Sequence, residues 1–265
     1  MIASGVLVPL VTPIDATGAV SSTDVRSLTD FLRPHADALV PALSTGEGGL
    51  LNGQQWSAMV AATVEHSGGL PVYAGALSST TAGVIEKAER AADLGAAAVV
   101  ATTPYGIAVT QQQMAQHYAE VCAASPIPVI VYDELEQSGN SLELSTLLDI
   151  CQLPGVVAVK DSQGDLQHWT ALVQARPDVA MWLGREELIG HAVGADGVLL
   201  AVCNLIPELC QRWWRGKEPA LAERIGEVCL GHSLFDPEWF IHVKTALRAA
   251  GRIAHDEPVS QMRTT

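Results

Sequence analysis

Short apolar runs alternate with longer stretches of mixed polarity along this chain, and the alternation occurs eight times. Each short run is nearly continuous in valine, alanine, leucine or isoleucine, as expected of a parallel strand that is covered on both faces. The pattern therefore predicts eight buried strands. Their expected bounds are Val6–Val11, Ala38–Leu43, Pro71–Ala74, Ala97–Ala101, Pro128–Tyr132, Val156–Lys160, Val179–Leu183 and Gly197–Ala201.

The longer stretches have the periodicity of amphipathic helices. Gly95 and Gly194 each stand where such a helix would end before the next strand. An unbroken series of strand–helix units favours a (β/α)8 TIM barrel over an open doubly wound sheet. A dinucleotide-binding sheet would also need a glycine fingerprint after its first strand, and residues 9–13 read Pro-Leu-Val-Thr-Pro instead. The expected helices in this series include Ser22–Arg33, Gln54–His66, Thr80–Leu94, Gln111–Ala124 and Leu166–Ala175.

Beyond the eighth strand the pattern predicts helices over Asn204–Arg215 and Asp236–Ala250, with C-terminal helices over about 218–253. The tail His255–Thr265 is polar, and we expect it to be poorly ordered. No linker or low-complexity segment interrupts the chain. Residues 1–265 are therefore expected to form a single barrel domain.

Composition narrows the function classes. Hydrophobic residues make up 48% and charged residues 17%, which suits a large core, yet no apolar run is long enough to cross a bilayer. The start of the chain lacks the basic region of a signal peptide, so we expect a cytoplasmic protein. A formal net charge of −14 argues against nucleic acid and anionic membranes as partners. The five cysteines are scattered and odd in number, and we expect reduced, mostly buried thiols.

The chain contains only four lysines, and one of them stands apart. Lys87 lies in a charged helical stretch typical of a solvated face, Lys217 is at a helix end, and Lys244 is expected at the surface or at an interface. Lys160 instead closes the apolar run of the sixth strand. Burial there would disfavour the ammonium form, and only a neutral amine can attack a carbonyl carbon. The same pattern also allows a lysine that leaves the barrel rim for solvent or pairs with Asp161.

Two other strand ends carry polar groups suited to carbonyl chemistry. Tyr132 ends the fifth strand, where its phenol could move a proton or merely cap the core. Ser44, Thr45 and Gly46 follow the second strand, where hydroxyl and backbone N–H groups could hold a carboxylate or cap the next helix. Active sites of barrel enzymes form at the carboxyl ends of the strands, so these groups are expected at one mouth.

Ser44-Thr45-Gly46-Glu47, Tyr132 and Val159-Lys160-Asp161, in this order, resemble the dihydrodipicolinate synthase / N-acetylneuraminate lyase family of class I pyruvate-dependent aldolases. The resemblance covers about residues 5–260. Its other motifs are Thr12-Pro13, Thr103-Pro104-Tyr105 and Gly194-Ala195-Asp196-Gly197.

The resemblance implies that Lys160 forms a Schiff base with the keto carbon of pyruvate, that Ser44 and Thr45 hold its carboxylate, and that Tyr132 carries protons. No cofactor is then needed, and the substrates are a small keto acid and an aldehyde or sugar-acid partner. Members of this family are typically homo-oligomers, so the resemblance implies a dimer or a tetramer. The substrate-binding positions expected on this basis are Thr45, Gly46, Tyr105, Gln137, Glu186 and Ala201.

This sequence departs from the family's pattern in three places. Gly106 stands where a second tyrosine would join the proton relay, and Gln137 stands where the synthase branch has the arginine that binds the second substrate. The neighbouring Glu134 and Glu136 add carboxylates that would repel a dicarboxylic partner. The chain also ends soon after Pro258, so a shortened C-terminal helical extension is expected.

Several alternatives stay open. Ser138-Gly139 and Ser162-Gln163-Gly164-Asp165 resemble the sugar-acid lyase branch, and Gly184-Arg185-Glu186-Glu187 lies where that branch contacts substrate hydroxyls. The polar residues Glu134, Gln137, Glu186 and Glu187 could bind a polyol or form a solvated rim. A 4-hydroxy-tetrahydrodipicolinate synthase-like activity and a degenerate keto-acid-binding protein without catalysis are the other readings. A metal-dependent aldolase is disfavoured, because the eight histidines show no acidic partner at ligand spacing.

Overall fold

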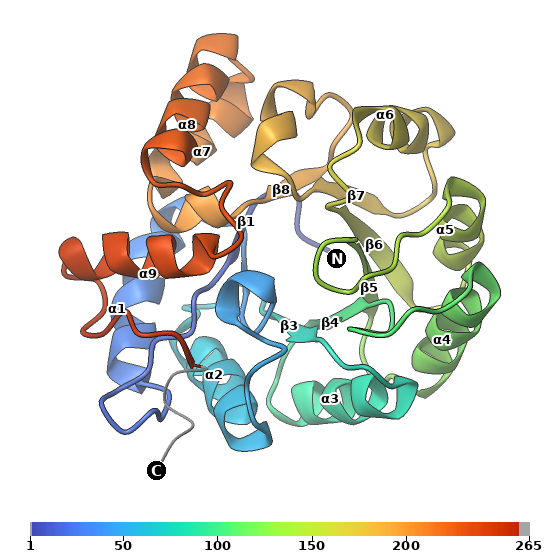
Figure 1. The fold of residues 1–265 in the computed structure, drawn as a ribbon, viewed down its shortest axis with the longest axis horizontal. Coiled ribbons are helices and arrows are strands. Elements are labelled where there is room, and N and C mark those ends of the chain that lie inside the picture. Colours follow the sequence, from blue (N-terminus) through green and yellow to red (C-terminus); the bar gives the residue numbers. More distant parts are fainter. Residues whose placement is uncertain (1, 260–265) are drawn as a thin grey trace.

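A computed structural model of the chain describes residues 2–259, and it shows a (β/α)8 TIM barrel (Figure 1). The eight strands are parallel and hydrogen-bonded in the order β2-β1-β8-β7-β6-β5-β4-β3. A parallel bridge between Leu39 and Val72 joins β2 to the start of β3 and brings the ends of the sheet together. The strands are β1 (Gly5–Pro9), β2 (Ala38–Val40), β3 (Tyr73–Ala76), β4 (Ala98–Thr102), β5 (Val129–Asp133), β6 (Val156–Asp161), β7 (Ala180–Leu183) and β8 (Gly197–Leu199).

Helices surround this sheet in the order expected for β-α units (Figure 1). Reciprocal capping boxes begin two of them, with Asn52 and Thr110 as the capping residues. After β7 the chain forms only a 3-10 turn, Glu186–His191, where a barrel helix would stand. The α-helices are α1 (Ser22–Leu32), α2 (Gly53–His66), α3 (Thr81–Asp93), α4 (Gln111–Ala124), α5 (Leu144–Cys151), α6 (Leu166–Ala175), α7 (Pro207–Gly216), α8 (Pro219–Gly231) and α9 (Trp239–Ala249).

The strands are continuously apolar because both of their faces are buried. One face meets the surrounding helices, and the other fills the barrel interior. Tyr73 and Trp182 stack in that interior with their ring centroids 5.7 Å apart. These rings make the barrel a packed core rather than a pore, so a ligand has access only to the ends of the strands.

Three strands end earlier than the apolar pattern predicts. β1 stops at Pro9 rather than Val11, and β2 stops at Val40 rather than Leu43. β8 stops at Leu199, so Ala201 begins a 3-10 turn instead of closing the strand. The reason is physical: apolar side chains continue into the buried loops, where the backbone has already left the sheet.

The prediction of a poorly ordered tail from His255 is wrong for the part that the structure describes. Residues 255–259 follow a defined path against α9, and Val259 is only 1% exposed. The backbone N–H of Val259 donates to a carboxylate oxygen of Glu47 at 2.6 Å. Residues 260–265 of the predicted tail lie outside the described residues.

Two of the four lysines also differ from expectation. Lys244 is fully buried rather than at a surface, and its ammonium group pairs with Glu47. Lys87 is half-buried and donates to the carbonyl oxygen of Leu77 at 2.6 Å. All five cysteines have free thiols, as predicted. Among the described residues, no helix is long and apolar enough to span a membrane.

Candidate active site

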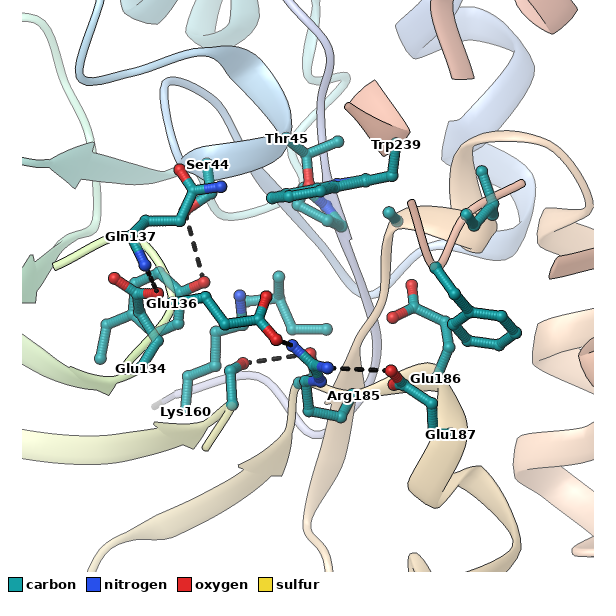
Figure 2. A pocket seen from close by; sticks show the side chains of 18 of the residues that line it. Ser44, Thr45, Glu134, Glu136, Gln137, Lys160, Arg185, Glu186, Glu187 and Trp239 are labelled. Carbon is teal, nitrogen blue, oxygen red and sulfur yellow. Dashed lines mark hydrogen bonds and ion pairs between the residues drawn. The ribbon is translucent and has the colours of Figure 1, made fainter. Parts of the chain in front are cut away.

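A cavity of about 380 Å³ opens at the carboxyl ends of the strands (Figure 2). Seven of the nine predicted site residues line it, which are Ser44, Thr45, Tyr132, Gln137, Lys160, Glu186 and Ala201. The other two lie behind the wall. Gly46 supports the turn that carries Ser44, and Tyr105 donates its hydroxyl to Oε1 of Gln137 at 2.9 Å.

Lys160 is the buried amine of this cavity. It lies beside Tyr132 in the register of β5 and β6, is 5% exposed, and has its Nζ 3.9 Å from the centroid of the Tyr132 ring. Burial lowers the pKa of Lys160 to about 7, against the opposing effect of the carboxylates of Glu186 and Glu134. A substantial fraction of the amine is therefore neutral near pH 7 and can act as a nucleophile.

Neither alternative placement of Lys160 is seen. The side chain does not reach solvent, and within residues 2–259 it makes no ion pair with Asp161. Asp161 Oδ1 instead accepts the backbone N–H of Gln163 at 3.0 Å. Gly184 provides the room that the amine needs, because a Cβ there would lie 2.6 Å from Cε of Lys160.

The Tyr132 hydroxyl lies between the amine and the turn after β2. Its oxygen is 3.4 Å from Oγ of Ser44, a long hydrogen bond in which either group can be the donor. Burial raises the pKa of Tyr132 above its ordinary value, and the nearby carboxylate of Glu134 raises it further. The phenol therefore stays protonated at neutral pH and can donate a proton to an oxygen in the cavity.

The turn that carries Ser44 and Thr45 is held by close backbone contacts. Residues 44–46 form a 3-10 turn, and Glu47 follows in the left-handed region at φ 55°. A Cβ on Gly48 would lie 1.9 Å from the carbonyl oxygen of Ala42, so no larger residue fits there. These constraints hold both hydroxyl side chains against the cavity.

Glu47 does not point into the cavity but fixes the turn from behind. Its Oε1 accepts Nζ of Lys244 at 2.7 Å, and its Oε2 accepts the N–H of Val259. Lys244 also donates to the carbonyl oxygen of Glu257 at 2.7 Å. The turn is therefore held by α9 and the segment after it, a role that the sequence analysis did not foresee.

Beyond Lys160 the cavity contains charged side chains, some of which the sequence indicated, and two aromatic side chains that were not predicted. Arg185 pairs with Glu136 and Glu187, and Phe235 and Trp239 come from the connection between α8 and α9 and from the first turn of α9 (Figure 2). The one sequence signal was the presence of aromatic residues inside a polar connection. Nothing in the periodicity indicated that this connection returns to the barrel mouth.

One histidine does have acidic neighbours, which corrects the expectation drawn from sequence spacing. Asp133 and Asp161 end β5 and β6, His168 lies on α6, and single ligand atoms of the three residues lie within 4.8 Å of one another. The amide of Gln163 donates to Oδ2 of Asp133 at 2.6 Å, and Nε2 of His168 is 3.4 Å from the same oxygen. The group forms a hydrogen-bonded network behind Tyr132 and Lys160.

Comparisons with known proteins agree with this architecture. Residues 2–264 match the dihydrodipicolinate synthetase family. The chain is 30% identical over 260 residues to 4-hydroxy-tetrahydrodipicolinate synthase of Aromatoleum aromaticum, covering 94% of this chain and 89% of the relative. An uncharacterised DapA-like lyase of Halobacterium salinarum is 35% identical over 212 residues, covering 77% of this chain and 69% of that protein.

A solved structure is similar over nearly its whole length. The chloride-inhibited dihydrodipicolinate synthase of Acinetobacter baumannii, determined in complex with pyruvate, superposes with a TM-score of 0.90 at 26% sequence identity. The match covers 99% of this chain and 96% of that one.

Proposed function

The chain belongs to the dihydrodipicolinate synthetase family and is a carbon–carbon lyase, and from this premise we propose that it is a class I aldolase that forms a Schiff base with pyruvate through Lys160. The observation that carries the proposal is the buried amine of Lys160, whose pKa is lowered to about 7 within reach of a protonated phenol. Complex formation with pyruvate by the Acinetobacter baumannii relative supports the choice of keto acid.

The first step is condensation. The neutral amine of Lys160 attacks the keto carbon, the carbonyl oxygen takes a proton from the phenol of Tyr132, and the resulting carbinolamine loses that oxygen as water. The iminium ion then loses a methyl proton to the phenolate left on Tyr132, which restores the phenol and gives an enamine. Ser44 and Thr45 hold the carboxylate of pyruvate with neutral hydroxyl donors, which avoids placing a second cation beside the amine.

The second step forms the carbon–carbon bond. The enamine carbon adds to the aldehyde carbon of an acceptor, the aldehyde oxygen takes up a proton, and water releases the product from Lys160. The same steps in reverse release pyruvate from a hydroxy-keto acid. Because Gly106 offers no side chain, Tyr132 and Ser44 carry the proton without a tyrosine at that position.

A narrower function is suggested by the relatives themselves, several of which are 4-hydroxy-tetrahydrodipicolinate synthases. In that reaction too, pyruvate would be bound by Ser44, Thr45, Tyr132 and Lys160. The position of Gln137 disfavours it, because the amide is bonded to Tyr105 and offers no positive charge to a carboxylate. The general aldolase is therefore the function we propose.

Trapping tests the proposal directly. The protein is incubated with pyruvate, reduced with borohydride and digested, and its peptides are weighed. The expected result is a stable adduct on the peptide that contains Lys160 and none in Lys160→Ala. An adduct elsewhere, or an equal adduct in the variant, would refute the proposal. A protein that forms the enamine also exchanges the methyl protons of pyruvate for solvent deuterium. A protein that only binds the keto acid does not.

A further inference from the structure

The cavity extends beyond Lys160 into a region that the acceptor of the enamine has to enter. This inference rests on the proposed function, because only an aldolase needs an acceptor. Five carboxylates line this region, and among the described residues the guanidinium of Arg185 is the one permanent positive charge there. The carboxylates belong to Glu134, Glu136, Glu186, Glu187 and Asp236.

Arg185 is already neutralised by its neighbours. Its Nη1 lies 2.9 Å from Oε1 of Glu136, and its Nη2 lies 2.9 Å from Oε1 of Glu187 (Figure 2). Both terminal nitrogens are thus engaged by a carboxylate on either side. A carboxylate on the acceptor would have to displace one of these partners before it could pair with the guanidinium.

The carboxyl groups of Glu186 and Glu134 add no attraction for an anion. Oε1 of Glu186 accepts the N–H of Val202 at 3.3 Å. Glu134 is 3% exposed and accepts the backbone N–H groups of Gln137 at 3.0 Å and Ser138 at 2.7 Å. Burial raises the pKa of both carboxyl groups, which favours their neutral form, so the exclusion of an anion depends on the carboxylates paired with Arg185.

Another wall of this region is mostly apolar. It is formed by Leu234, Phe235, Pro237 and Trp239, together with the exposed side chain of Asp236, from the connection between α8 and α9 and the first turn of α9. The indole of Trp239 extends across the cavity beside Thr45 (Figure 2), and the Phe235 side chain is 40% exposed. Aromatic faces of this kind stack on planar apolar groups.

We propose that the acceptor half of the cavity excludes aldehydes that bear a carboxylate and takes an uncharged aldehyde with a planar apolar group, such as an aromatic aldehyde, that stacks on Trp239. The carboxylates around Arg185 provide the exclusion, and the aromatic wall provides the binding surface. The proposed acceptors therefore do not include semialdehydes that carry a carboxylate.

A matched pair of acceptors tests this specificity. Benzaldehyde and 4-carboxybenzaldehyde differ only in the carboxylate, and each is supplied with pyruvate while formation of the aldol product is followed. We expect kcat/KM to be at least about tenfold higher for benzaldehyde. Equal values, a preference for the carboxylated aldehyde, or a preference for glyceraldehyde over benzaldehyde would overturn the inference.

Two variants assign the effect to the residues. Glu136→Gln combined with Glu187→Gln frees Arg185, and should raise kcat/KM for 4-carboxybenzaldehyde until the tenfold preference disappears. Trp239→Leu should lower kcat/KM for benzaldehyde about tenfold, whereas Trp214→Leu, on α7 and outside the cavity, should not. An unchanged ratio in the double variant, or an equal effect of the two tryptophan variants, would contradict the assignment.

The readouts separate this inference from the function on which it rests. Deuterium exchange into pyruvate without any aldehyde reports enamine formation alone. A protein that exchanges deuterium but shows no preference between the matched aldehydes keeps the aldolase function and loses the proposed specificity. A protein that neither exchanges deuterium nor forms the borohydride adduct refutes the aldolase function itself.

Discussion

Nζ of Lys244 lies 2.7 Å from Oε1 of Glu47, and both side chains are completely shielded from solvent. This ion pair joins α9 to the turn that carries Ser44 and Thr45. Because each buried charge depends on the other, the pair fixes the position of this turn more than it adds net stability.

Lys244→Met is therefore expected to be strongly destabilising. It leaves the carboxylate of Glu47 buried without its cation, a change that costs about 3–5 kcal/mol of unfolding free energy. Urea unfolding measures the loss, and the KM for pyruvate should rise because the turn is no longer held. In Glu47→Gln/Lys244→Met, which removes both charges, the stability loss should be smaller than in Lys244→Met alone.

Truncation tests the contacts that the segment after α9 makes with Glu47 and Lys244. A chain ending at residue 256 keeps α9 but loses the N–H of Val259 and the carbonyl of Glu257. It should bind pyruvate more weakly than a chain ending at residue 259, which keeps both contacts. Equal KM values for the two chains would show that the segment after α9 does not position the turn.

The rate of adduct formation should depend on the ionisation of Lys160. Its pKa is about 7, so the neutral fraction and the rate should fall about tenfold per pH unit well below that value. The carboxylate of Glu186 raises this pKa, so Glu186→Gln should lower it and move the rate profile to lower pH. Glu65→Gln, exposed on α2, is the matched control and should leave the profile in place.

Tyr132→Phe removes only a hydroxyl. Deuterium exchange into pyruvate should fall by about 10²–10⁴-fold, the usual contribution of a positioned acid or base. Tyr73→Phe is the matched control, because the hydroxyl of Tyr73 accepts the backbone N–H of Ala3 at 2.8 Å and does not line the cavity. That control should lose about 1 kcal/mol of stability but keep the exchange rate.

Much of the fold was predictable because both faces of each strand are buried, so the apolar runs stand out against amphipathic helices. Helix α5 was not predicted. It has only eight residues, Leu144–Cys151, which is too short for a clear periodicity.

The candidate site was also predictable only in part. Tyr132 and Lys160 stand at strand ends and Ser44 in the turn after β2, and the carboxyl ends of barrel strands meet at one mouth. Lys244 carries no such signal, because its partner is 197 positions away in the sequence and a charged residue on a helix resembles a surface residue. Val259 contributes only a backbone N–H, which residue type does not reveal. The place of Trp239 in the cavity could not be predicted, because it depends on the path of the connection after α8.

The anchoring of Glu47 has a consequence for how the protein is made. The ribosome has synthesised all eight strands, and the catalytic candidates on them, before it adds Lys244 and Val259. The turn with Ser44 therefore waits for groups that are translated about two hundred positions later. A nascent chain with all eight strands would still lack the contacts that fix this turn. The proposed substrate site would therefore form late in synthesis, after the barrel strands are made.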